Sequence, residues 1–402
     1  MIEEVLALSL LSLCGQSLLI FHHSSLNLHL NPIMLLFYHD YCSEQKNFYL
    51  CKLKRVLLAM SNRKVLVTGG AGYIGSHTAV ELINAGYEVI IVDNLSNSDR
   101  SSLAGIAAIT GVTPTFVEAD CCDREAMERL FAEHDFQSVI HFAAFKAVGE
   151  SVAEPLKYYQ NNIGSLVNIL DLMRRYERRN IVFSSSATVY GDADVLPVTE
   201  RTPRKPATSP YGNTKQMAED ILRDSVAAVE HLNGIALRYF NPIGAHPSAL
   251  IGELPRGVPN NLVPYITQTA AGVRECLSIF GDDYPTPDGS CLRDYIDIVD
   301  LARAHVVAID RMVEGRNKEA FEIFNVGTGR PVSVFELVHG FEEANNLKLN
   351  YKVAPRRAGD VTAVWADTTL ANEELGWRAE RELTDTLRSA WAWECHVRNI
   401  KQ

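Results

Sequence analysis

The chain contains a tyrosine and a lysine four residues apart, Tyr211 and Lys215, at the start of a segment that we predict to be a helix. Side chains at this spacing lie on one face of a helix, so the two groups can act together. A tyrosine with its ordinary pKa of about 10 is a poor base at neutral pH, but a neighbouring ammonium favours the phenolate. The spacing alone is common, and a surface pair would also explain it.

The predicted strand before this helix ends in three serines, Ser184, Ser185 and Ser186. The carboxyl ends of parallel strands meet at one edge of a sheet, and ligands bind along that edge. A serine hydroxyl there can hold a substrate oxygen beside Tyr211 and Lys215. This position, rather than the spacing of the pair, favours a shared catalytic site.

Residues 64–75, KVLVTGGAGYIG, run from a short apolar strand directly into closely spaced glycines. Glycines let a turn tighten and let the backbone approach a pyrophosphate at a helix N-terminus, where no side chain would fit. The glycines concerned are Gly69 or Gly70, Gly72 and Gly75. An ordinary glycine-rich turn is the alternative, but a helix over about 76–85 and a second apolar strand complete a βαβ unit. This unit predicts a bound dinucleotide.

The second strand ends at Asp93, at about the distance from the glycines that dinucleotide-binding folds require. A carboxylate there can accept hydrogen bonds from the ribose of adenosine, and its charge repels the extra phosphate of NADP. NAD is therefore the predicted cofactor, with a solvated aspartate as the alternative. The nicotinamide cation, like Lys215, would bring the pKa of Tyr211 toward 7, where proton transfer is effective.

The composition excludes several other classes of protein. The 402 residues are 47% apolar, as in globular proteins with a large core, and the net charge of −11 opposes a nucleic-acid surface. The eight cysteines contain no Cys-x-x-Cys motif, so we expect neither a metal site nor a redox motif. Reduced thiols in the cytoplasm are the expectation.

Residues 1–60 differ from the rest of the chain, with an apolar run over residues 5–21 and no pattern that leads into the fold. A signal peptide would begin with positive charge, whereas this segment begins with Glu3 and Glu4, and the run is at the short limit for a membrane span. Membrane anchoring is the alternative that we do not favour. Because Met60-Ser-Asn-Arg-Lys64 resembles an ordinary bacterial start, a mis-assigned start codon is our interpretation.

Strands and helices alternate along the rest of the chain and position the chemical groups. Further strands are expected over residues 115–120, 138–143, 180–186 and 235–239, and helices over 124–134, 155–176 and 210–231. This alternation predicts a doubly wound parallel sheet of the Rossmann type in residues 61–240. From Asn241 on, Pro- and Gly-punctuated segments predict a smaller α/β substrate-binding domain, residues 241–402, that closes a cleft over the cofactor.

Seven short motifs occur in order between residue 63 and about residue 395. They span Thr68–Thr78, His141–Ser151, Ser184–Gly191, Ser209–Lys215, Arg238–Pro242, Pro259–Leu262 and Arg293–Ile296. With these motifs the chain resembles the extended short-chain dehydrogenase/reductases and, among them, the family of UDP-glucose 4-epimerases. The resemblance implies tightly held NAD, UDP-glucose and UDP-galactose as substrates in galactose metabolism, and a cytoplasmic homodimer without a metal.

The resemblance also implies roles for individual residues. It places NAD against Gly69, Gly72, Tyr73, Ile74, Gly75, Asp93, Asn94, Leu95, Ser96, Asn97, Ser98, Asp120, Cys121, Phe142, Ala143, Lys146, Asn161, Tyr211, Lys215 and Phe240. It places the UDP-sugar against Ser186, Tyr211, Asn241, Asn261, Leu262, Ser278, Ile279, Phe280, Arg293, Arg357 and Asp360. Arginine forks suit a diphosphate on an otherwise acidic protein.

The implied reaction inverts C4 of the sugar through oxidation, rotation of a 4-keto sugar and return of the hydride to its other face. Tyr211 would take the proton of the 4-hydroxyl while NAD accepts the hydride, Ser186 would polarise the same oxygen, and Lys215 would hold the nicotinamide ribose. A related dehydratase or decarboxylase would place an acidic residue after the serine, where Ala187 and Thr188 stand. A non-catalytic NAD-binding sensor would typically lack the tyrosine and the lysine.

One position concerns the width of the sugar pocket. Val364 stands where a tyrosine restricts the pocket in this family and where a smaller residue admits N-acetylated sugars. The resemblance therefore implies that UDP-N-acetylglucosamine is also a substrate.

Overall fold

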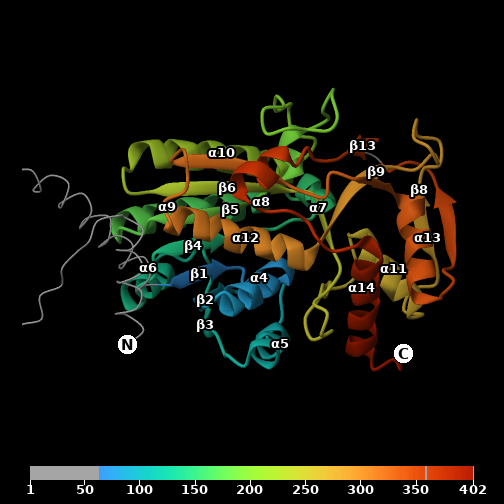
Figure 1. The fold of residues 1–402 in the computed structure, drawn as a ribbon, viewed down its shortest axis with the longest axis horizontal. Coiled ribbons are helices and arrows are strands. Elements are labelled where there is room, and N and C mark those ends of the chain that lie inside the picture. Colours follow the sequence, from blue (N-terminus) through green and yellow to red (C-terminus); the bar gives the residue numbers. More distant parts are fainter. Residues whose placement is uncertain (1–62, 358–359, 402) are drawn as a thin grey trace, which may run out of the picture. The chain divides into compact units, whose positions relative to one another are not determined.

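The structure is a computed structural model that describes residues 63–357 and 360–401 (Figure 1). The expectations about residues 1–60 concern a segment that lies outside the described residues. Within the described part of the chain, no helix has the length and apolar character that crossing a membrane requires.

The largest element is a sheet of seven strands in the order β10-β6-β5-β4-β1-β2-β3, and every neighbouring pair is parallel. The strands are β1 (Lys64–Thr68), β2 (Glu88–Asp93), β3 (Thr115–Glu118), β4 (Ser138–His141), β5 (Asn180–Ser186), β6 (Asn233–Tyr239) and β10 (Phe321–Val326). Six of them were predicted within a few residues. This sheet and its flanking helices confirm the doubly wound fold.

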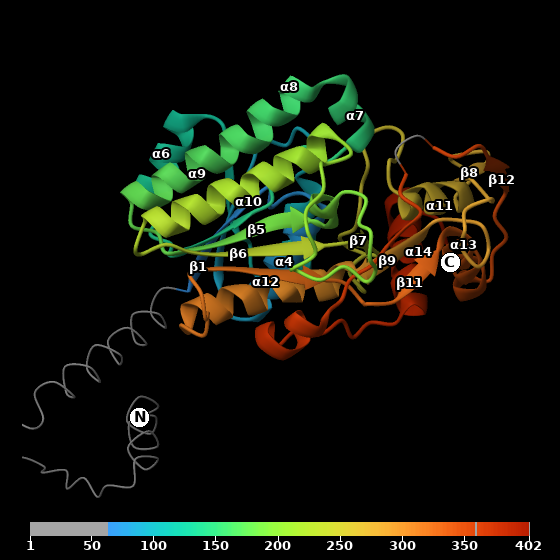
Figure 2. The same cartoon turned by 90° about the horizontal axis from the view of Figure 1, so that it is seen from above.

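Helices cover both faces of the sheet, because successive side chains of each strand point to opposite faces. Val65 and Val67 of β1 belong to one apolar cluster, and Leu66 between them belongs to another. The first cluster includes α4 (Tyr73–Asn84), α5 (Ser101–Thr110) and α12 (Ile298–Val313). The second includes α6 (Arg124–Glu133), α9 (Gly164–Arg175) and α10 (Pro210–Ala228). Figure 2 shows α9 and α10 on the opposite side of the sheet from α12.

The seventh strand, β10, comes from the part of the chain that we assigned to the second domain. It pairs with β6, and α12 before it packs against α4. Residues 298–326 therefore return to the large sheet after the chain has left it. The division into residues 61–240 and 241–402 stays a prediction. The chain passes more than once between the large sheet and the elements outside it.

Several elements of the C-terminal part of the chain form a second group around a separate apolar cluster. One small sheet contains β7 (Asn241–Ile243), β9 (Leu292–Asp297), β11 (Pro331–Ser333) and β13 (Ala363–Val364). Another pairs β8 (Leu277–Phe280) with β12 (Tyr351–Ala354). The helices are α11 (Leu262–Ala270), α13 (Val334–Asn345) and α14 (Leu383–Arg398). Since β7 follows β6 after one residue, this group begins at the carboxyl edge of the large sheet.

The predicted helix over residues 155–176 is not uniform. It consists of α8 (Pro155–Tyr158), a π-helical turn η1 (Tyr159–Ile163) and α9, and the short helix α7 (Val148–Ala153) precedes it. A π-helical turn widens the helix locally and is frequent at functional sites. Here it contains Asn161, one of the residues predicted to contact NAD.

Candidate active site

The turn between β1 and α4 has the close backbone contacts that a pyrophosphate site needs. Gly69 has a φ of +68°, and a Cβ on it would lie 2.9 Å from the backbone nitrogen of Ala143. A Cβ on Gly75 would lie 2.4 Å from the carbonyl oxygen of Gly69. Gly72 is the N-cap of α4 and forms no side-chain cap, so the helix N-terminus is left open for an anion. This cradle fits a dinucleotide.

Asp93, at the end of β2, organises the loop that follows it. Its buried carboxylate accepts hydrogen bonds from the amide of Ala71 at 3.1 Å, the amide of Leu95 at 2.9 Å and the hydroxyl of Ser98 at 2.7 Å. A carboxylate has about four acceptor positions, so these three bonds leave room for a ribose hydroxyl. Asp93 thus links the glycine turn to the loop at residues 94–98.

The predicted cofactor residues occupy one edge of the large sheet. Asp93 ends β2, Asp120 and Cys121 follow β3, and Phe142 and Ala143 follow β4. Phe240 separates β6 from β7, and Ser186, predicted as a catalytic and substrate-binding residue, ends β5 at the same edge. The structure therefore brings residues from these five strand ends to the edge where ligands bind in such sheets.

The structure brings the three predicted catalytic residues together. Lys215 donates from Nζ to the carbonyl oxygen of Ser184 at 2.6 Å, and its Nζ lies 5.9 Å from the centre of the Tyr211 ring. The side chain of Ser186 lies near enough to Tyr211 to lower the pKa of the phenol. Helix α10 starts immediately before Tyr211 because Ser209 caps it, accepting from the amide of Gly212 at 3.2 Å.

In the cofactor-free protein, burial decides the pKa values of Tyr211 and Lys215. Burial raises the pKa of Tyr211, and the hydroxyl of Ser186 opposes this rise only in part. Burial also lowers the pKa of Lys215 to about 8, against the opposing effect of the Glu219 carboxylate. The lowered pKa that we predicted for Tyr211 beside both Lys215 and the nicotinamide cation stays a prediction for the cofactor-bound protein. Without the cofactor, desolvation has the largest effect on the pKa of Tyr211.

A buried ion pair between Glu219 and Arg238, near Lys215, was not predicted from the sequence. Glu219, fully buried, accepts from Arg238 through Nε at 2.9 Å and Nη2 at 2.6 Å, and from the hydroxyl of Ser185 at 2.6 Å. Tyr239 was missed as well, and its hydroxyl hydrogen-bonds that of Ser184. A signal for Glu219 was present, because it stands four residues after Lys215 on the same helix face.

The π-helical turn η1 docks onto this site through Asn162. Its side chain accepts from the amide of Phe145 at 2.9 Å and donates to the carbonyl oxygen of Phe145 at 3.0 Å and to the hydroxyl of Thr214 at 3.2 Å. Asn161 donates to the same side chain at 2.9 Å. Asn162, absent from our prediction, thus fixes the position of the predicted residue Asn161.

The predicted UDP-sugar residues form a second cluster, in the second group of elements. Asp360 lies 2.8 Å from Arg357 and 3.8 Å from Arg293 on β9, measured between charged atoms. The guanidinium of Arg357 lies 5.9 Å from the ring centre of Phe280, which is 43% exposed at the end of β8. Two cations and an exposed aromatic ring in one place suit a nucleoside diphosphate.

Other predicted substrate residues lie at the starts of short elements. Asn241 is the first residue of β7, Asn261 is the N-cap of α11 and Leu262 its first residue. Asn261 is joined to the predicted cofactor residue Lys146 through Glu253, whose Oε1 accepts from Asn261 at 2.6 Å and from Lys146 at 3.0 Å. No sequence signal pointed to Glu253, because eight and 107 residues separate it from its partners.

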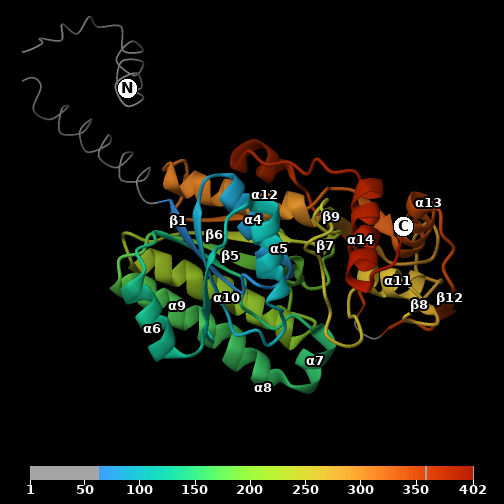
Figure 3. The ribbon, with the colours of Figure 1, turned by 90° about the horizontal axis from the view of Figure 1, so that it is seen from below.

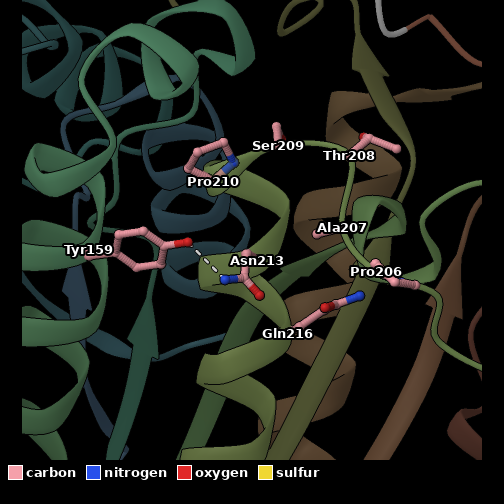
Figure 4. Close-up of a pocket in the computed structure, with 8 residues that line it drawn as sticks. All are labelled: Tyr159, Pro206, Ala207, Thr208, Ser209, Pro210, Asn213 and Gln216. Carbon is pink, nitrogen blue, oxygen red and sulfur yellow. Dashed lines mark hydrogen bonds between the residues drawn. The ribbon is translucent and has the colours of Figure 1, made fainter.

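An open hollow of about 390 Å³ lies beside the first turns of α10 (Figure 4). Figure 4 shows Tyr159 pointing toward Asn213 at the wall of this hollow, where Nδ2 of Asn213 donates to the Tyr159 hydroxyl at 2.8 Å. Neither Tyr211 nor Lys215 lines this hollow, so it is not the candidate site. Among the residues that the structure describes, no group of histidine, cysteine and carboxylate side chains could hold a metal ion.

Comparisons with known proteins place the chain in a family. The family model for GDP-mannose 4,6 dehydratase matches residues 66–390. The UDP-glucose 4-epimerase of Bacillus subtilis is 51% identical over 330 residues, which cover 82% of this chain and 96% of the relative. That of Dictyostelium discoideum is 49% identical over 331 residues, covering 82% and 95%.

Comparison with solved structures points to the same family. The UDP-glucose 4-epimerase of Bifidobacterium longum, in complex with NAD+ and UDP, is 46% identical with a TM-score of 0.80, covering 84% of this chain and all of that one. The enzyme of Stenotrophomonas maltophila, with bound NAD and formylated UDP-arabinopyranose, is 47% identical with a TM-score of 0.81, covering 84% and 99%. At this identity over nearly the whole length of its relatives, the chain belongs to the UDP-glucose 4-epimerase family of the extended short-chain dehydrogenase/reductases.

Proposed function

We propose that the protein interconverts UDP-glucose and UDP-galactose by inverting C4 of the sugar, with no net oxidation or reduction. The observation that carries the proposal is the meeting of Ser186, Tyr211 and Lys215 at the same sheet edge as the glycine turn. The family of the chain supports it, because the relatives with about half of their residues identical are named for this reaction.

The cradle of Gly69, Gly72 and Gly75 would hold the pyrophosphate of NAD, and Asp93 would hold its adenosine ribose. When bound, NAD supplies the hydride acceptor and donor that inversion at a carbon without an acidic proton needs. The ammonium of Lys215 would hold the nicotinamide ribose. Its hydrogen bond to the carbonyl oxygen of Ser184 already fixes its position in the protein alone.

Tyr211 would take the proton from the 4-hydroxyl of the sugar and later return it, with Ser186 polarising the same oxygen. Burial favours the neutral phenol in the cofactor-free protein, as its raised pKa indicates. A positive charge brought next to the ring by a ligand favours the phenolate instead. The phenolate of Tyr211 that acts as the base is therefore favoured when the ligand is bound, because the ligand brings a positive charge next to the ring.

Arg293 and Arg357 would bind the diphosphate, and Asp360 would hold both guanidinium groups in place beforehand. Phe280 offers an exposed ring beside Arg357 for the uracil base. Since the diphosphate and base are held apart from the sugar, the sugar is left free to rotate between its two faces.

A dehydratase is the second candidate, favoured by the description of the matching family model. That reaction needs an acidic group beside the serine to support elimination. Ala187 and Thr188 provide none, and both directly follow Ser186. The chemical product distinguishes the two reactions, because elimination releases a 4-keto-6-deoxy sugar nucleotide.

We further propose that Val364 admits N-acetylated sugars. It lies in the apolar cluster that contains Phe240 and Ala187, next to Ser186, and it pairs with Arg293 of β9. A valine is smaller than a tyrosine by roughly a ring, so the wall of the pocket recedes there. UDP-N-acetylglucosamine would then fit beside the same catalytic residues.

We also propose a cytoplasmic homodimer in which a second copy covers the outer face of α7 to α10. Exposed apolar side chains gather on these mutually contacting helices: Val152, Leu156, Val167 and Met217. Four cysteine thiols within the described residues form no disulfide, as is usual in a reducing compartment: Cys121, Cys122, Cys276 and Cys291. Light scattering during gel filtration would give the oligomeric state, and a monomer would contradict the proposal.

The decisive experiment is a coupled assay of UDP-galactose conversion on purified protein without added NAD. Tyr211→Phe removes the acid and base and should lower turnover by about 10² or more. Tyr176→Phe, at the C-terminus of α9 and away from the site, is the matched control and should keep wild-type turnover. Near wild-type turnover of Tyr211→Phe would refute the mechanism, and a 4-keto-6-deoxy product would identify a dehydratase instead.

A further inference from the structure

Residues 250–256, which we call the strap, run from the region after β7 toward α11 and end on the loop after β2. Arg256 donates from Nη1 to the carbonyl oxygen of Ser96 at 3.0 Å and from Nη2 to that of Ser98 at 2.6 Å. The hydroxyl of Ser98 in turn donates to Asp93 at 2.7 Å. One guanidinium therefore holds the middle and the end of the loop at residues 94–98 that Asp93 organises.

This loop contains backbone that needs external support. Leu95 has a φ of +56°, a left-handed conformation that is unfavourable for a residue with a branched side chain. Such a conformation persists only where the surrounding contacts hold it. Here Asp93 holds the Leu95 amide from one side, and Arg256 holds the carbonyl groups of the residues that follow.

The rest of the strap is firmly anchored, which gives Arg256 a fixed base. Ile251 packs so closely on Gly105 of α5 that a Cβ there would lie 2.5 Å from its side chain. Trp393 of α14 donates from its indole to the carbonyl oxygen of Glu253 at 2.9 Å. Figure 3 shows the chain between β7 and α11 passing between α5 and α14. Arg256, exposed at the end of this anchored segment, is its contact with the loop.

We propose that Arg256 is a positioning residue for the cofactor, which fastens residues 94–98 over the adenosine and slows the release of NAD. The inference rests on the proposed function, because that function assigns these residues to NAD. Arg256 acts through two backbone carbonyl groups and contacts no catalytic residue. Its loss therefore changes how long NAD stays bound and leaves the chemical step at full NAD occupancy unchanged.

The two hydrogen bonds of Arg256 make it possible to test whether the shape of its guanidinium or only its charge matters. The guanidinium fork reaches both carbonyl groups at once, whereas an ammonium keeps the charge but lacks the planar fork. Arg256→Lys should therefore release NAD at a rate between those of wild type and Arg256→Ala. Full restoration by lysine would overturn the positioning role, because it would show that charge alone suffices.

The test measures the exchange of bound NAD against excess isotopically labelled NAD on the purified full chain, followed by gel filtration. Arg256→Ala should exchange about tenfold faster than wild type, the effect of losing about 1.4 kcal/mol from charged hydrogen bonds. Turnover at saturating NAD should stay unchanged. Arg388→Ala is the matched control, since Arg388 is exposed and also donates to a backbone carbonyl, that of Ala344 at 3.2 Å, on another element.

The outcomes separate the two proposals. If the wild-type protein binds no NAD, the proposed function fails. If it binds NAD and Arg256→Ala exchanges at the wild-type rate, the role of Arg256 fails while the function stands. A loss of turnover at saturating NAD in Arg256→Ala would also overturn the inference, because it would assign Arg256 to the chemistry.

Discussion

Replacing Lys215 by methionine should make the cofactor-free protein more stable and inactive. The lysine is 4% exposed, and burial lowers its pKa from 10.5 to about 8. A difference of this size is equivalent to about 3 kcal/mol of unfavourable free energy when the buried amine is charged. Methionine has a similar length and carries no charge, so it avoids this cost. It loses the hydrogen bond to Ser184, which offsets part of the gain at every pH.

The pH dependence isolates the effect of the charge. The folded-state pKa lies below the unfolded one, so between about pH 8 and 10.5 the unfolded state binds more protons than the folded state. The stability of the wild type therefore rises with pH in this window. The advantage of Lys215→Met should be largest at pH 7 and should shrink by about 2 to 3 kcal/mol by pH 10. Other titrating groups are common to both proteins and cancel in the difference.

Urea unfolding of protein stripped of nucleotide, at several pH values from 7 to 10, measures this difference. Bound NAD must be absent, because a ligand stabilises the folded state by mass action. Lys352→Met, at an exposed lysine of β12, is the matched control for the substitution itself. If the difference between Lys215→Met and wild type does not change with pH, the buried ammonium is not the source of the cost, and the reasoning fails.

Three other changes test separate parts of the structure. Gly75→Ala puts a Cβ 2.4 Å from the carbonyl oxygen of Gly69 and should abolish NAD binding, measured by calorimetry, whereas Gly149→Ala meets nothing within 4 Å and should bind normally. Glu219→Gln leaves the buried Arg238 without its carboxylate and should cost about 3 to 5 kcal/mol in urea unfolding; a cost below about 1 kcal/mol would show that the pair is solvated. Val364→Tyr should lower kcat/KM for UDP-N-acetylglucosamine relative to UDP-glucose, and an unchanged ratio would show that this position is not the gate.

The sequence by itself determined the features that depend on neighbouring residues. The glycines at 69, 72 and 75 follow from the local geometry of a strand-to-helix turn, and Tyr211 and Lys215 share a face because of helical periodicity. The apolar strands were found for the same reason, since burial on both faces imposes continuous apolar runs. The residues of each signal lie within about 20 residues of one another, so one chain segment is enough to identify each signal.

Tertiary structure alone decided the rest. β10 joins the large sheet beside β6 although more than 80 residues separate the two strands in the chain. Glu253 bridges Lys146 and Asn261, and Arg256 fastens the loop after Asp93, across separations that no periodicity connects. The pKa values of Tyr211 and Lys215 are also decided by the tertiary structure, because they depend on how much water the whole fold removes from each group. Local spacing placed the catalytic pair on one helix face, but burial within the assembled fold decided the protonation states of Tyr211 and Lys215 in the cofactor-free protein.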